Sequence, residues 1–463
     1  MLLPGLLALL LSGSAGGVIR TILLSFALSL VMNFYLTALL VWLKWYTATN
    51  LYLIVTVEIA ALLFLTRGAI NQPLAILLTT LGAKFNSHKK ELIHRSSRGE
   101  RLLALASLLT LALFSYNYLA GIGSIFDHGD DIVSWNRWAV DWYNGYFPRM
   151  TWNYPQLLPA NWSLSYLFLK GSTLQCFAKS ICPLFSLFLL LALYDLWVRR
   201  QDFSFLCAIP VTAFLCVALT GASMNKGYAD LPVAFLSFMS VYVLWAGKGD
   251  PAAKSDKNIV IGSLCCAGAA LTKQAGLYVL GIYPLLCYLL AEGSFRAPGR
   301  MAKAGKIAAI YLLLFVLTAP WYLYTAAKIV AGQEKSEITY VTHDIYQGRT
   351  MWGRLLDFGD KVKENLHLLI SPVSSAQGLS TVAFLVLITA VLCLCLALLY
   401  FIVQSLPDAS CRYLVLLIVV PYLCIWARFF SYDFRNLTIA FPFIGVAAGN
   451  GIYRRLRVCR SAR

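Results

Sequence analysis

Long apolar runs recur from one end of this 463-residue chain to the other, with short polar segments between them. The runs are about 17 to 25 residues long, which lets a helix cross roughly 30 Å of hydrocarbon. Strands of a transmembrane barrel would instead show about ten alternating residues each. The pattern therefore predicts an all-α polytopic membrane protein with about 12 or 13 transmembrane helices.

Composition excludes a soluble protein, because 59% of the residues are hydrophobic and the mean hydropathy is +0.70. A soluble fold would have to expose much of this apolar surface to water. The net charge of +17 raises the question of nucleic acid. Most of the basic residues fall in short loops between apolar runs, where positive charge sets membrane orientation. We therefore expect membrane lipids as partners and no nucleic acid.

The basic segment 84–101 predicts the sidedness of the chain, since short basic loops stay in the cytoplasm. The next apolar run then leads outward, which places loop 123–159 on the outer face. Continuing the alternation places loop 330–370 on the same face and the basic tail 456–463 inside. We expect N-terminal spans and a basic loop over 1–101, and a transmembrane catalytic domain over 102–455.

The first outer loop carries an unusual acidic cluster, with Asp127, Asp130 and Asp131 close to His128. Carboxylates are costly at membrane depth, so the cluster must face water or serve a function there. A general base has to be an ionisable group close to the proton that it removes, and either Asp130 or Asp131 is a candidate. A simpler interpretation is a short juxtamembrane helix over 131–143, with Trp135, Trp138 and Trp142 anchored in the interface.

Further motifs fall on the predicted outer side. Residues 154–159 read YPQLLP, residues 227–232 read GYADLP, and residues 271–276 read LTKQAG. Together with the acidic pair, this order resembles the membrane-embedded glycosyltransferases of the GT-C fold. The most similar branch is that of bacterial enzymes like protein mannosyltransferases and aminoarabinose transferases. The resemblance extends over about residues 102 to 450.

The resemblance implies roles for single residues. Asp130 or Asp131 would be the catalytic base, and Asp230 would be the second acidic position. Lys273 and Arg435 would bind the donor phosphate, and Lys226 is a third candidate. Cations there also make physical sense, because negative charge grows on a departing phosphate. We assign substrate binding to Asp230, Tyr228, Arg137, Tyr154 and His343.

The implied reaction is an inverting transfer of a sugar from a polyprenyl-phosphate carrier to a lipid, glycan or protein acceptor. It would take place at the outer face of the bacterial cytoplasmic (inner) membrane. No cofactor is assigned with certainty, and His343 and Asp344 could join the acidic cluster around a divalent metal. Two alternatives stay open. A carrier-lipid transporter or flippase predicts repeats and charges at mid-span, and a polysaccharide polymerase or ligase predicts arginines in a large outer loop.

Overall fold

The computed structural model describes residues 2–13, 17–70, 97–247, 255–290, 300–334, 381–429 and 433–461. Within these residues the chain is helical and contains no strand. Seven of the helices are long and apolar enough to cross a membrane, and four shorter apolar helices accompany them. The chain is therefore an all-α integral membrane protein. The expected total of 12 or 13 spans stays a prediction.

The N-terminal half contains, in chain order, α1 (Leu3–Ser12), α2 (Val18–Trp42), α3 (Ala48–Ile70), α5 (Arg98–Gly121), the π-helix η1 (Asp131–Asn136), α6 (Arg137–Tyr143), α7 (Leu157–Leu169), α8 (Cys176–Lys179), α9 (Cys182–Arg200), α10 (Phe203–Thr220) and the 3-10 helix η2 (Gly221–Asn225). The C-terminal half contains α11 (Asp230–Ala246), α12 (Ser255–Thr272), α13 (Gly276–Leu290), α14 (Arg300–Val330), α17 (Thr381–Ser405), α18 (Ala409–Leu414), the π-helix η4 (Val415–Val419), α19 (Val420–Phe429), the 3-10 helix η5 (Phe434–Ala440) and α20 (Phe441–Ser461).

Helix α11 forms the centre of the bundle, because it packs against α9, α12, α13 and η5. All of its residues are buried, from Asp230 to Ala246. A helix that is apolar all round has to be surrounded by other helices or by lipid, and here helices surround it. Its first residue, Asp230, is consequently fixed at one end of the core.

Helix α20 approaches α10 closely through two glycines spaced four residues apart. A Cβ on Gly445 would come within 2.0 Å of the Thr212 hydroxyl oxygen, and one on Gly449 within 2.4 Å of the Ser204 carbonyl oxygen. Small residues at this spacing allow membrane helices to pack backbone to backbone. This packing holds η5, which leads directly into α20, beside α11.

Helix α3 lies at the edge of the bundle, with only 6% of its apolar window buried. Leu53, Leu63 and Phe64 are all more than half exposed. Such a surface is suited to lipid, because lipid tails are as apolar as these side chains.

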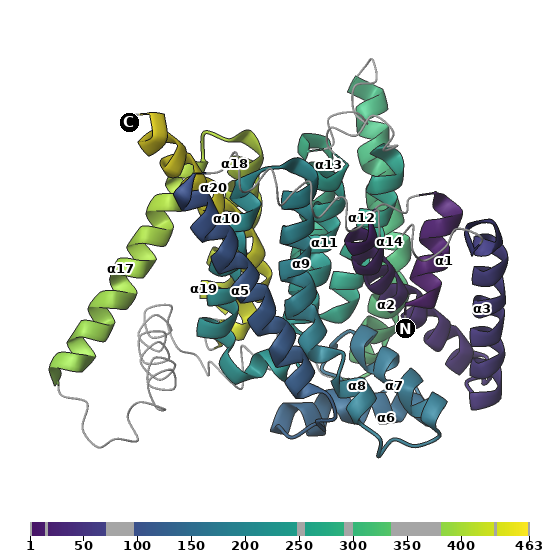
Figure 1. The fold of residues 1–463 in the computed structure, drawn as a ribbon. Coiled ribbons are helices and arrows are strands. Elements are labelled where there is room, and N and C mark those ends of the chain that lie inside the picture. Colours follow the sequence, from purple (N-terminus) through teal and green to yellow (C-terminus); the bar gives the residue numbers. More distant parts are fainter. Residues whose placement is uncertain are drawn as a thin grey trace.

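The helices of the bundle run between two opposite ends (Figure 1). We call the end that holds Arg20, Arg199, Lys257 and Arg454 the basic end. The opposite end, where α6, α7 and α8 lie, is called the site end (Figure 1). The short helix predicted over 131–143 is present as η1 followed by α6.

The tryptophans of η1 and α6 share one helix face, as their spacing predicts. Trp135, Trp138 and Trp142 are at most 6% exposed, and Asp131 on the same face is fully buried. This face packs inside the protein, mainly against α7. The interpretation of these tryptophans as anchors in the membrane interface is therefore wrong.

Candidate active site

The acidic loop after α5 is held by a lysine that the sequence analysis missed. The ammonium of Lys179, in α8, lies 3.4 Å from Asp131 Oδ2 and 3.7 Å from Asp127 Oδ1. It also lies 5.1 Å from the centre of the Phe126 ring. The side chain of Lys179 is only 6% exposed. One buried cation therefore holds both ends of the segment that carries the acidic pair.

Asp130 and Asp131 are adjacent in sequence, yet their environments differ. The Asp131 side chain is fully buried, whereas that of Asp130 is 56% exposed. The difference follows from η1, which begins at Asp131 and turns this side chain inward. π-Helices are rare and are frequently found at functional sites. Of the two carboxylates, Asp130 is therefore the one that is accessible from outside.

Asp127 lies between two cations, because Lys226 is 3.6 Å from the carboxylate oxygen that Lys179 also approaches. Loss of water contact raises the pKa of Asp127. The charges of Lys226 and Lys179 lower it more, so the pKa lies below its usual value. The predicted cation Lys226 therefore reaches the acidic loop.

The second loop of the site packs directly on the first. A Cβ on Gly227 would come within 2.7 Å of the Phe126 ring, so only glycine allows this approach. The next residue, Tyr228, is hydrogen-bonded through its hydroxyl to Nδ1 of His128. Burial raises the pKa of Tyr228 to about 12, so the hydroxyl stays neutral at physiological pH.

Asp230 and Lys273 form the tightest ion pair between distant segments of the site. The ammonium of Lys273 lies 2.7 Å from Asp230 Oδ1 and donates a hydrogen bond of the same length to Asn436 Oδ1. The Thr438 hydroxyl donates to the backbone oxygen of Asp230 at 2.9 Å. Helix α11, the end of α12 and η5 are thus joined at one point.

Arg435 connects this point to the acidic loop. Its Nη2 lies 2.5 Å from Asp433 Oδ2 and 3.7 Å from Asp130 Oδ2. Its guanidinium also lies 4.0 Å from the centre of the Tyr228 ring. Burial lowers the pKa of Arg435, but the carboxylates of Asp230 and Asp433 raise it more, so the side chain stays charged. Arg435 therefore both pairs with Asp433 and contacts the predicted site.

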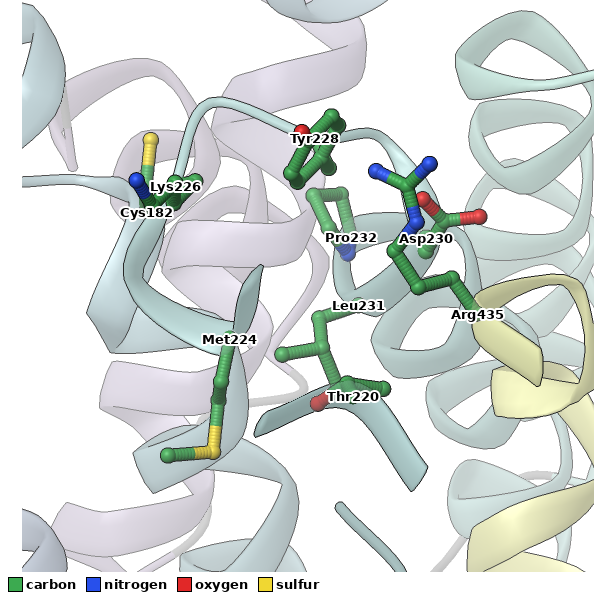
Figure 2. Close-up of a pocket in the computed structure, with 9 residues that line it drawn as sticks. All are labelled: Cys182, Thr220, Met224, Lys226, Tyr228, Asp230, Leu231, Pro232 and Arg435. Carbon is green, nitrogen blue, oxygen red and sulfur yellow. The ribbon is translucent and has the colours of Figure 1, made fainter. Parts of the chain in front are cut away.

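A small pocket of about 10 Å³ lies among these residues, with room for about one water molecule. Figure 2 shows Lys226 on one side of it and Arg435 with Asp230 on the other, while Leu231 and Met224 line the lower part. The pocket is therefore charged on part of its wall and apolar on another part.

The structure does not bring every predicted site residue to this cluster. Arg137 donates hydrogen bonds at the exposed surface to the carbonyl oxygens of Arg149 and Met150, at 3.5 and 3.4 Å. The Tyr154 ring packs on Trp135 and Trp138, with centroids 5.6 and 6.1 Å away. Neither residue is part of the ion-pair network around Asp130. His343 lies outside the described residues.

No group of three His, Cys, Asp or Glu side chains that could hold a metal ion is found among the described residues. Asp344, which was considered together with His343, also lies outside them.

Comparison with known proteins yields no relative. No model of a protein family, no curated protein and no solved structure matches the chain. The resemblance to GT-C glycosyltransferases therefore stays a prediction that rests on the order of the motifs. The structure shows that residues of four distant segments, 127–131, 226–230, Lys273 and Arg435, form one polar cluster at the site end of an integral membrane protein.

Proposed function

We propose that the protein is a glycosyltransferase that moves a sugar from a polyprenyl-phosphate carrier to an acceptor at the membrane surface. One observation carries the proposal. The exposed Asp130 carboxylate lies 3.7 Å from Arg435, which lines a pocket that combines cations with an apolar wall. An amphiphilic donor with a phosphate next to its lipid chain fits this combination.

Asp130 is the proposed general base, and Asp131 has a positioning role. A base must come within hydrogen-bond reach of the acceptor proton, and the Asp130 side chain is open to the surface. Asp131 is enclosed and engaged with Lys179, so an acceptor would have to displace a buried ion pair to reach it. This assignment chooses between the two carboxylates that the motif left open.

Arg435, Lys273 and Lys226 are the proposed phosphate-binding groups. When the bond between the sugar and the phosphate oxygen breaks, negative charge develops on the leaving polyprenyl phosphate. Cations that are already fixed stabilise this charge without reorganising. The carboxylates of Asp433 and Asp230 hold Arg435 and Lys273 in place before the substrate arrives.

In the proposed step, the acceptor oxygen attacks the anomeric carbon from the side opposite to the phosphate, which inverts the configuration. The acceptor proton passes to Asp130, a new bond forms between the sugar and the acceptor, and the phosphate leaves with the electron pair of the broken bond. The pocket has room for about one water molecule, so donor binding requires it to widen. Met224 and Lys226 line it and have long, flexible side chains.

The cluster lies at the site end, while the arginines and lysines of the basic end lie opposite (Figure 1). Basic loops favour the cytoplasmic side, which supports an outward-facing site at the bacterial inner membrane.

The test is transfer of labelled sugar from polyprenyl-phosphate donors to envelope extracts by protein in reconstituted vesicles. Asp130→Asn should slow transfer by at least about a hundredfold in protein that remains folded. Asp141→Asn, eleven residues further along the same loop, is the matched control and should transfer normally. Movement of the labelled carrier across the vesicle membrane with its sugar intact would contradict the proposal and favour a transporter.

A further inference from the structure

Gln274 has a buried carboxamide that is not used by the fold. It follows Lys273 in the turn between α12 and α13. Within the described part of the chain, neither Nε2 nor Oε1 of Gln274 has a hydrogen-bond partner, although both atoms are buried. A carboxamide can donate two hydrogen bonds and accept two. Burying such a group without partners is unfavourable, so it normally has a partner in the working state of a protein.

Gln274 directly follows a residue of the proposed donor site. Consecutive Cα atoms are about 3.8 Å apart, so Gln274 is a direct neighbour of Lys273, whose ammonium binds Asp230. The turn is also tight. A Cβ on Gly276 would come within 2.3 Å of the Ala269 backbone, which shows how closely the chain returns on α12. Gln274 is therefore held at a fixed position beside the phosphate-binding lysine.

A second buried amide group belongs to the segment that packs on the end of α12. Gln156 is fully buried, and its Oε1 has no hydrogen-bond partner among the described residues, while its Nε2 donates to the Tyr154 carbonyl oxygen at 2.9 Å. The next residue, Leu157, lies 3.7 Å from where a Cβ on Gly268 would be. The loop before α7 and the last turns of α12 are thus neighbours.

We infer that Gln274, supported by Gln156, forms a neutral subsite for the hydroxyl groups of the transferred sugar. The inference rests on the proposed function and deepens it. The cations Lys273 and Arg435 suit a phosphate, whereas an uncharged carboxamide suits groups that both donate and accept hydrogen bonds. A sugar ring presents such hydroxyls directly beside the phosphate. The turn 273–274 therefore binds charge with one residue and hydroxyls with the next.

The experiment separates the two parts of the donor by using two kinds of probe. Farnesyl phosphate presents the phosphate alone, and farnesyl phosphate carrying glucose, mannose or galactose adds a sugar. Dissociation constants are measured with purified full-length protein in detergent. We expect at least one sugar-bearing probe to bind more tightly than farnesyl phosphate. Gln274→Met should weaken that probe roughly three- to tenfold, which is the effect of losing one neutral hydrogen bond, and leave farnesyl phosphate unchanged.

Gln404→Met is the matched control, because the same substitution is made near the basic end in α17, and both probes should bind as to the original protein. Gln156→Met should reduce the sugar preference in the same direction as Gln274→Met. If Gln274→Met does not fold, Gln274→Glu keeps the size and one acceptor but removes the amide donors, and it should also reduce the preference.

The possible failures are distinguishable. If the original protein binds neither kind of probe, the proposed function and the hydroxyl subsite both fail. If it binds farnesyl phosphate but prefers none of the sugar-bearing probes, the subsite alone is overturned. The same holds if the preference is present and survives in folded Gln274→Met or Gln274→Glu.

Discussion

The ammonium of Lys179 lies 3.4 Å from the Asp131 carboxylate, and both side chains are buried. Removing one member of a buried ion pair leaves an uncompensated charge, which commonly costs roughly 3–5 kcal/mol. We expect Lys179→Met to lower the thermal unfolding temperature clearly. The double variant Lys179→Met with Asp131→Asn should recover part of the loss, because the unpaired charge is then absent. If the stability lost in the double variant equals the sum of the losses in the two single variants, the two side chains are not coupled.

The two carboxylates of the acidic pair should respond differently to the same change. Asp130→Asn should reduce the transfer rate by a factor of roughly 10² to 10⁴, the usual contribution of a general base, and leave the unfolding temperature nearly unchanged. Asp131→Asn should lower the unfolding temperature, because its carboxylate is engaged with Lys179. Parallel measurements of rate and unfolding temperature check this, and the reverse pattern would exchange the two roles.

Lys273→Met should slow transfer by roughly 10²- to 10³-fold, the range seen when one preorganised group that stabilises developing charge is removed. Since the change also leaves Asp230 without its partner, Lys273→Met should be compared with the double variant that adds Asp230→Asn. Lys170→Met removes a cation after α7 that is not part of the cluster, and it should transfer at the normal rate. Equal slowing in Lys170→Met would indicate a general charge effect.

The close packing of α20 gives a prediction about stability. Gly449→Val should destabilise the protein by roughly 1–3 kcal/mol, because the added side chain would meet the Ser204 carbonyl oxygen. Gly281→Ala in α13 is the control, since a Cβ there meets nothing within 4 Å. Unfolding in detergent measures both. An unaffected Gly449→Val protein would mean that α10 and α20 are not in close contact.

The pH dependence of the acidic loop follows from the lowered pKa of Asp127. A carboxylate whose pKa is lowered by folding stabilises the fold above its unfolded value, near pH 4, and this contribution is lost as the pH falls through the folded value. Lys226→Met should raise the pKa of Asp127, so that acid protonates this carboxylate at a higher pH. Infrared difference titration of the variant against Lys170→Met measures the shift. An identical titration of both would exclude coupling to Lys226.

Much of the fold and part of the site are predictable from the sequence. The apolar runs mark the helices because lipid offers the backbone no hydrogen-bond partners. A segment that crosses the membrane satisfies its own backbone hydrogen bonds by forming a helix. Asp230, Lys273 and Arg435 could be grouped because charges beside apolar runs lie on one predicted side of the membrane, and Tyr228 belongs to the same motif as Asp230. Their mutual contacts within 4.0 Å add the geometry that the order of motifs lacks.

The sequence does not indicate which way a side chain in a loop points. Lys179 looks like an ordinary solvated lysine in a short polar segment, and only the folding of α8 under the acidic loop makes it a partner of Asp131. Arg137 is close to the acidic pair in sequence, yet α6 turns it toward Met150. The spacing of Trp135 and Trp138 predicts a shared face, but it contains no information on whether protein or lipid covers that face.

The π-helix η1 makes the acidic loop sensitive to its exact length. Each residue of an α-helix advances the chain by about 100° around the axis, so deleting one residue between Asp131 and Trp135 would rotate everything before the deletion by that amount relative to α6. The remaining residues would follow one another in the same order. Asp131 would nevertheless lose its contact with Lys179, and Asp130 would no longer face Arg435. In this loop the number of residues is therefore as strict a requirement as their chemical identity.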